Sequence, residues 1–157
     1  MSITCVLVDD ILGQAADPKS SYGSATFQAV HGRDEIRFIF ISPFDSFLER
    51  YDLQAAVEAF DKLVEAPDLF LVDLNYEEDG PGELHLGLRI IEWLARSKRF
   101  AHVPRALFTT TGQDQPASSF EGRTVDEVLV HYKTPYINKD VALGGNLIDS
   151  VRSVLGE

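Results

Sequence analysis

Polar side chains able to bind phosphate or metal ions follow short apolar runs at several points of the sequence. They are carboxylates, an amide, a hydroxyl and an amine: Asp9, Asp10, Asp73, Asn75, Thr109 and Lys139. Carboxylates that lie close together repel one another unless a cation or protons offset their charge. Mg²⁺ prefers oxygen ligands and commonly uses one or two carboxylates together with a phosphate oxygen. Brought together, these residues would form a magnesium-dependent phosphate site with Asp10 and Asp73 as ligands of the ion.

A carboxylate can also be the nucleophile that attacks a phosphoryl group and forms an aspartyl phosphate. A metal ion and a lysine then offset the charge of the transferred oxygens. Asp73 occupies the central position for this role, and Lys139 and Thr109 would contact the phosphate. The residue types therefore predict phosphoryl chemistry centred on Asp73.

Short apolar runs predict the strands that would position these residues. The runs span residues 3–8, 36–41, 69–72, 105–108 and 136–137, and most are rich in branched or aromatic side chains. Helical periodicity lies between and after the later runs, at residues 53–64, 84–95, 124–132 and 147–155. Strands that alternate with helices imply right-handed crossovers and a parallel sheet covered by helices on both faces. Ligands bind beyond the carboxyl ends of such strands, so the polar residues are expected at one edge of the sheet.

The segment from Ile11 to Glu35 breaks this alternation because Gly, Ser and Pro interrupt it. Two structures are open for it, namely a short helix near residues 24–31 or a hairpin that leads into the strand at residue 36. Further along, Thr124 and Glu127 have the spacing of a capping box, which predicts that a helix begins there.

Composition limits the class of protein. The 157 residues predict one domain, 1–157, and the 14 basic and 25 acidic side chains give a formal net charge of −11. This charge repels phosphate backbones and anionic lipid, so we expect neither nucleic acid nor a membrane as a direct partner. Cys5 is the single cysteine and cannot form an internal disulfide. The N-terminus lacks a signal-peptide pattern and no apolar stretch approaches about 18 residues, so the sequence predicts a cytoplasmic protein.

Five stretches of the sequence resemble the receiver domain of bacterial two-component response regulators. The similar stretches are "VLVDD" ending at Asp10, "APDLFLVDLN" around Asp73, "LGLRIIEWL" after it, "VPRALFT" ending at Thr109, and "YINK" ending at Lys139. The resemblance covers nearly the whole chain. It implies a flavodoxin-like, doubly wound sheet of five parallel strands in the order 2-1-3-4-5, with helices on both faces.

The resemblance also implies a role for each site residue. Asp73 would accept a phosphoryl group from a histidine kinase or a phosphotransfer protein. Asp10, Asp73 and the backbone carbonyl of Asn75 would bind Mg²⁺, and Asp9 would contribute mainly through a bound water.

Further implied roles concern the response to phosphorylation. Lys139 would pair with the phosphate, Thr109 would move towards it, and Tyr136 would change rotamer. The last strand and the last two helices would then present an altered face to a downstream protein or to a second copy of the chain. We expect a stand-alone switch without an output domain, rather than a turnover enzyme.

The sequence departs from the family pattern at two places near these residues. Glu77, Glu78 and Asp79 follow Asn75, and they form either a solvated acidic loop or a group that weakens phosphate binding or attracts a second ion. Asp140 follows Lys139 where the family usually has a proline with a cis bond, so the bond is either trans or strained.

Two other classes of function stay open. One is a pseudo-receiver that binds partners without being phosphorylated. The other is a Mg²⁺-dependent phosphohydrolase with an aspartyl nucleophile, which is disfavoured because "VLVDDI" lacks the Asp-x-Asp arrangement usual after the first strand of such enzymes.

Overall fold

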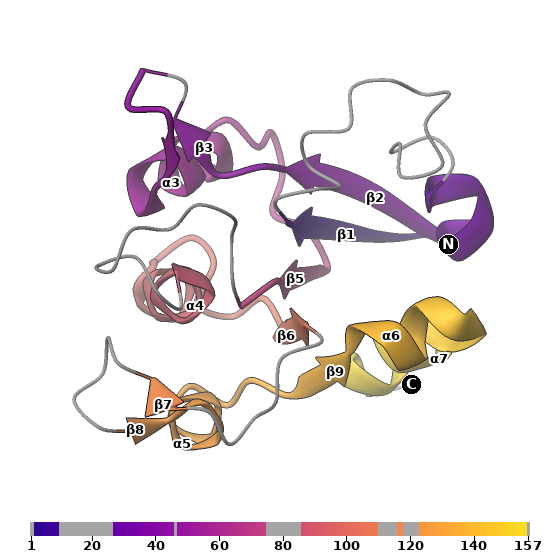
Figure 1. Cartoon of the computed structure of the whole chain (residues 1–157). Coiled ribbons are helices and arrows are strands. Elements are labelled where there is room, and N and C mark those ends of the chain that lie inside the picture. Colours follow the sequence, from indigo (N-terminus) through magenta and orange to yellow (C-terminus); the bar gives the residue numbers. More distant parts are fainter. Residues whose placement is uncertain are drawn as a thin grey trace.

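A parallel sheet forms the centre of the computed structural model, which describes residues 2–9, 27–45, 47–74, 86–109, 116–117 and 123–156. Its strands are β1 (Ile3–Val8), β2 (Ile36–Ile41), β5 (Leu69–Val72), β6 (Arg105–Thr109) and β9 (Tyr136–Asn138). They lie in the order β2-β1-β5-β6-β9 (Figure 1). Counted along the chain, this order is 2-1-3-4-5, so the predicted sheet and its strand order are confirmed.

Helices cover both faces of the sheet, as predicted. One side carries α3 (Leu53–Asp61), α4 (Leu86–Arg96) and α5 (Val125–His131). On the other side lie η1 (Gln28–Gly32) and the succession α6 (Lys139–Val141), η3 (Ala142–Asn146) and α7 (Leu147–Val154) (Figure 1). No helix of the described residues is long and apolar enough to span a membrane.

Two apolar cores lie on the opposite faces of the sheet, and β1 contributes to both of them. Val6 and Val8 belong to the core under α3, α4 and α5, whereas Cys5 and Leu7 belong to the core under η1 and α7. Successive side chains of a strand point to opposite faces. A strand that is buried on both faces therefore appears in the sequence as a continuous apolar run, which is why "ITCVLV" does not alternate.

The predicted helix at residues 53–64 is too long at its carboxyl end. α3 ends at Asp61, and Val64 is 94% exposed in the loop that follows. The guanidinium of Arg99 donates to the carbonyl oxygens of Phe60, in the last turn of the helix, and of Leu63, in the loop after it. The apolar spacing of the last predicted turn was therefore not a helical signal.

The predicted start of α5 is confirmed. The hydroxyl oxygen of Thr124 accepts a hydrogen bond from the Glu127 N–H at 3.1 Å and so caps the helix. In the segment from Ile11 to Glu35, the described residues 27–35 form a helical turn and a tight turn before β2, so the helix alternative holds there. The rest of that segment lies outside the described residues.

Gln28 of η1 lies against the outer edge of β2, the first strand of the sheet. Glu35 and Ile41 direct their carbonyl oxygens to β1, so the main-chain groups of Ile36 and Phe38 point away from the sheet. The carboxamide of Gln28 donates to the carbonyl oxygen of Ile36 at 2.6 Å and accepts from the Phe38 N–H at 2.7 Å. One side chain thus satisfies two main-chain groups of the edge strand.

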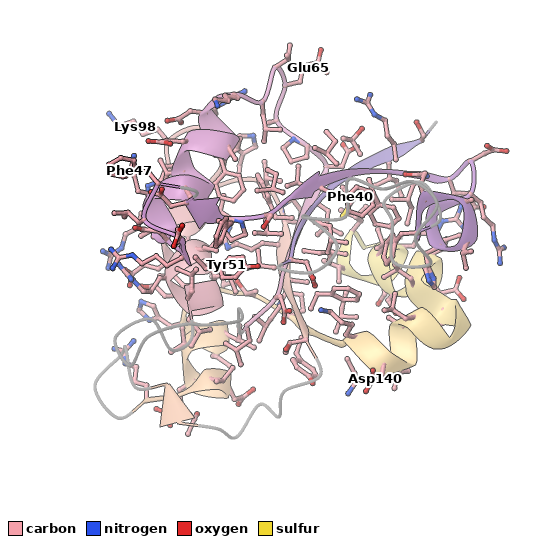
Figure 2. All side chains as sticks on the ribbon, turned by 45° about the horizontal axis from the view of Figure 1, so that its top comes forward. Phe40, Phe47, Tyr51, Glu65, Lys98 and Asp140 are labelled. Carbon is pink, nitrogen blue, oxygen red and sulfur yellow. The ribbon has the colours of Figure 1, made fainter. Side chains whose placement is uncertain are left out.

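Two small antiparallel pairs were not predicted. They are β3 (Phe44–Asp45) with β4 (Arg50–Tyr51), and β7 (Pro116–Ala117) with β8 (Arg123–Thr124). In the first pair the carboxylate of Asp45 accepts hydrogen bonds from the N–H groups of Phe47 and Leu48, at 2.9 and 3.0 Å. Figure 2 shows Phe47 at the outer edge of the molecule and Tyr51 towards its interior.

Candidate functional site

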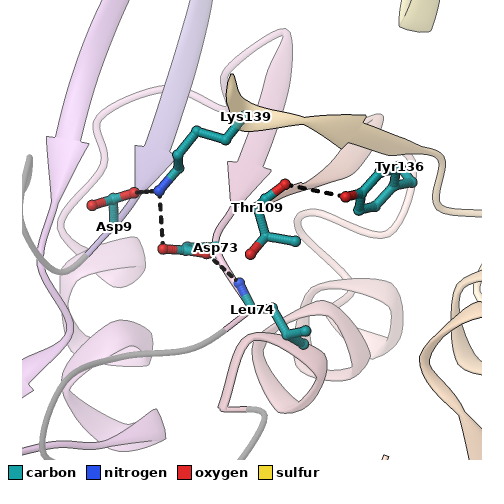
Figure 3. Close-up of polar contacts among 6 residues, drawn as sticks. All are labelled: Asp9, Asp73, Leu74, Thr109, Tyr136 and Lys139. Carbon is teal, nitrogen blue, oxygen red and sulfur yellow. Dashed lines mark hydrogen bonds and ion pairs between the residues drawn. The ribbon is translucent and has the colours of Figure 1, made fainter. Parts of the chain in front are cut away.

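The predicted polar residues that the structure describes lie at one edge of the sheet, beyond the carboxyl ends of the strands. The N–H of Asp9 donates to the carbonyl oxygen of Ile41, and the N–H of Asp73 donates to that of Val8, at 3.1 and 3.0 Å. Each aspartate is therefore held by the last hydrogen bond of the sheet ladder. Thr109 is the last residue of β6, and Lys139 follows β9 directly. The strand order itself brings these residues together (Figure 3).

Lys139 joins the two aspartates. Its Nζ lies 2.5 Å from Oδ2 of Asp9 and 3.0 Å from Oδ2 of Asp73. The Asp9 and Asp73 side chains are only 1% and 10% exposed, and Lys139 is 17% exposed. Ion pairs are screened weakly in such surroundings, so each charge strongly affects the others. Two carboxylates share a single ammonium group here, which leaves this triad with a net negative charge.

Burial raises the pKa of Asp73 from 3.8 to about 6, and the negative charge of Asp9 adds to this effect. The Lys139 ammonium and hydrogen bonds from Lys139 and Thr109 act in the opposite direction but do not outweigh burial. For Lys139, burial alone would lower the pKa, but the Asp73 and Asp9 carboxylates outweigh it and raise the pKa. With a pKa of about 6, Asp73 is mostly ionised at neutral pH. Its carboxylate is also more basic than that of an ordinary aspartate.

Thr109 is buried, and its main chain is linked to the aromatic residue of the last strand. The Tyr136 hydroxyl donates to the carbonyl oxygen of Thr109 at 3.3 Å. Thr109 also lies opposite Asn138 in the register of β6 and β9. A displacement of Thr109 would therefore also displace Tyr136 and β9, to which its main chain is bonded.

Several predicted features lie outside the described residues. They are the predicted metal ligands Asp10 and Asn75 and the acidic residues 77–79. Asp9, Asp73, Thr109, Lys139 and Tyr136 are the predicted site residues whose surroundings the structure describes.

Sequence reasoning missed three contacts of the site. The N–H of Leu74 donates to Oδ1 of Asp73 at 2.7 Å, and Gly87 of α4 packs against the main chain of the same two residues. Asn138 caps α6, because its side-chain oxygen accepts from the Val141 N–H at 3.0 Å. An asparagine directly before a helix is a usual capping signal and could have indicated that a helix begins at Lys139. The Lys139–Asp140 peptide is trans, which settles the geometry left open above.

The donor set fits a hard divalent cation. Asp9 and Asp73 present carboxylate oxygens at the same edge, and their combined charge exceeds that of the one ammonium group between them. Mg²⁺ characteristically binds one or two carboxylates and keeps several waters. The described residues contain no group of three His, Cys, Asp or Glu side chains that could hold a metal ion.

Comparisons with known proteins point to the receiver-domain fold. No family model and no curated protein matches the sequence. Among solved structures, a signal receiver domain of two-component signal transduction (histidine kinase) from Clostridium thermocellum has a TM-score of 0.60 and 18% identity, over 99% of this chain and 98% of that one. A CheY-like response regulator receiver domain from Methylobacillus flagellatus has a TM-score of 0.56 and 13% identity, over 98% and 99%. The Mn²⁺-bound form of response regulator Rcp1 has a TM-score of 0.50 and 19% identity, over 98% and 90%. The chain therefore has the fold of a response regulator receiver domain.

Proposed function

We propose that this chain is a phosphorelay switch in which Asp73 accepts a phosphoryl group from a histidine kinase or a phosphotransfer protein. The observation that carries this proposal is the buried carboxylate of Asp73, 3.0 Å from the ammonium group of Lys139 and beside the second carboxylate of Asp9. A buried nucleophile with an adjacent cation at the ligand-binding edge of a receiver fold suits acceptance of a phosphoryl group.

The reaction requires an ionised carboxylate. One oxygen of Asp73 forms a bond to phosphorus while the bond between phosphorus and the donor's imidazole nitrogen breaks, and the electron pair of that bond returns to the imidazole. With a pKa of about 6, Asp73 is ionised at neutral pH and keeps the basicity of a good nucleophile. Lys139 is placed to stabilise the charge on the phosphoryl oxygens.

A divalent cation is the proposed cofactor. Asp9 and Asp73 would hold it together with Asp10 and the backbone carbonyl of Asn75, and when bound it would offset the charge of the phosphoryl oxygens. Support comes from the oxygen donors on this edge and from the Mn²⁺ in the structurally similar regulator Rcp1. We propose Mg²⁺ as the ion used.

Phosphorylation would act on a protein partner through the face formed by β9, α6 and α7. The hydrogen bond from Tyr136 to Thr109 supports this, because it connects the site to β9. A groove of about 670 Å³ also lies on this face, lined among others by Tyr136, Ile137, Val141 and Val154. A downstream protein or a second copy of the chain would bind here. Such a relay would operate in the cytoplasm.

The test is incubation of the purified chain with Mg²⁺ and a small acyl phosphate. We expect a single phosphoryl adduct, base-labile and located on Asp73 by mass spectrometry. Asp73→Asn should abolish the adduct, removal of Mg²⁺ with EDTA should suppress it, and Asp149→Asn, which changes an exposed acid of α7, should leave it unchanged. No adduct from the acyl phosphate or from phosphorylated histidine kinases would favour a binding module, and rapid turnover of varied phosphate esters would favour a phosphohydrolase.

A further inference from the structure

Gly87, in the first turn of α4, touches the main chain of the proposed phosphoacceptor. Its N–H donates to the carbonyl oxygen of Leu74 at 3.1 Å. A Cβ at Gly87 would lie 2.0 Å from the carbonyl oxygen of Asp73 and 2.7 Å from the Cα of Leu74. Both atoms belong to the main chain, so no side-chain rotation could make room for it. The helix and the peptide after Asp73 approach so closely because residue 87 has no side chain.

The same peptide holds the carboxylate of Asp73. The Leu74 N–H donates to Oδ1 of Asp73 at 2.7 Å, while Oδ2 accepts from Lys139 at 3.0 Å. Movement of this peptide would therefore shift the carboxylate relative to the ammonium group.

Neither side of the contact can easily yield. α4 is fixed by side chains that are completely buried, namely Leu86, Leu88, Ile90, Ile91 and Leu94. On the other side, the N–H of Asp73 is bonded to the carbonyl oxygen of Val8 at the end of the sheet ladder. Close-packed interiors transmit such a displacement rather than absorb it.

We propose that Gly87 is a positioning residue for phosphoryl acceptance: its missing side chain lets α4 seat against the peptide between Asp73 and Leu74 and fixes the Asp73 carboxylate opposite Lys139. This inference rests on the proposed function. Gly87 itself touches neither the phosphoryl group nor its donor.

Gly87→Ala tests the proposal, and Gly144→Ala is the matched control because a Cβ at Gly144 meets nothing within 4 Å. Phe38→Ala is a second control, because it destabilises the core on the opposite face of the sheet and leaves α4 unchanged. The rate of adduct formation is measured against the concentration of acyl phosphate. A misplacement of about 1 Å can cost a hundredfold in rate, so Gly87→Ala should lower the maximal rate roughly tenfold to a hundredfold. The concentration of acyl phosphate that gives half the maximal rate should stay within about twofold of the wild-type value. The maximal rates of both control variants should also stay within about twofold of the wild-type rate.

A spectroscopic measurement separates positioning from general destabilisation. In the wild type, the amide proton of Leu74 should resonate downfield because it is bonded to a carboxylate. Gly87→Ala should shift this resonance upfield while the spectrum of α7 is unchanged. Phe38→Ala should leave the Leu74 resonance in place even though that variant unfolds at a lower temperature.

The outcomes are distinct. A folded Gly87→Ala variant with wild-type rate and wild-type Leu74 resonance would overturn the proposal. If that variant does not fold, hydrogen exchange of the wild type decides: amides of Leu74 and Gly87 that exchange as slowly as those of Ile90 and Ile91 support the seating, and much faster exchange overturns it. If the wild type forms no adduct, the proposed function fails, and the Leu74 resonance alone decides whether Gly87 positions the peptide.

Discussion

Asp73 is subject to two opposing influences on its ionisation. Burial raises its pKa to about 6, while Lys139 lowers it. In the unfolded chain the carboxylate has an ordinary pKa of 3.8, so the folded state binds the proton more tightly. Ionisation of Asp73 therefore costs stability in the folded protein when no cation is bound. A divalent cation bound at the proposed site would offset this cost, because its positive charge favours the ionised form of Asp73.

Because the pKa of Asp73 is higher in the folded than in the unfolded state, the substitution Asp73→Asn should change how stability depends on pH when no metal is bound. The contribution of Asp73 to stability is fully present below pH 3.8 and is lost as the pH rises to about 6. A shift of one pKa unit corresponds to about 1.4 kcal/mol. The free energy of unfolding of the variant, relative to that of the wild type, should therefore increase by up to about 3 kcal/mol as the pH rises across this window. Urea unfolding in EDTA measures the difference, with Asp149→Asn as the control. A difference that does not change with pH would contradict the raised pKa.

At this scale the sequence predicted the residues of the site better than their contacts. Asp9, Asp73, Thr109 and Lys139 could be proposed because the carboxyl ends of parallel strands share an edge. That Lys139 would reach both carboxylates depends on side-chain distances that no pattern records. The contact of Gly87 with the Asp73 main chain depends on how closely α4 approaches the sheet, which is equally a tertiary property.

Among the elements, the pair β3 and β4 combines a buried anchor with an exposed tip. The rings of Phe44 and Tyr51 pack edge to face at 5.2 Å, and Tyr51 is 4% exposed. Phe47 is 92% exposed at the turn. Tyr51 therefore carries the packing of this hairpin, while Phe47 contributes nothing to the core.

Two matched truncations test this division. Tyr51→Ala should destabilise the protein by about 3 kcal/mol, since a large buried aromatic side chain leaves a cavity. Phe47→Ala should change stability by less than about 0.5 kcal/mol, as exposed substitutions usually do. Thermal and urea unfolding measure both. Equal effects of the two substitutions would show that the tip is packed in solution.

The main strands and helices could be predicted because their patterns are long. Buried parallel strands give continuous apolar runs, and amphipathic helices repeat over several turns. The two-residue strands of the hairpins have no measurable period, so they were missed. The end of α3 was misjudged because apolar residues beyond Asp61 continued the spacing by chance, while the helix ends with Lys62 as its C-cap.

On the scale of the whole molecule, the parallel sheet ends at β2 on one side, and Gln28 covers part of that edge. We predict that Gln28→Ala leaves the main-chain groups of Ile36 and Phe38 without their partner and promotes association of sheets. Light scattering and thioflavin fluorescence during gentle heating should report faster aggregation than in the wild type. Gln54→Ala, on the exposed surface of α3, is the control. Equal aggregation rates for both variants would contradict this role.

Among the described residues no strand lies beyond β2, and Gln28 supplies one donor and one acceptor at the positions that a neighbouring strand would use. Proteins commonly restrain their sheet edges with charges, prolines or bulges. Here the same restraint comes from a neutral amide, which keeps its hydrogen bonds at any salt concentration or ordinary pH. Protection of this sheet edge should therefore depend little on ionic strength and strongly on a single uncharged side chain.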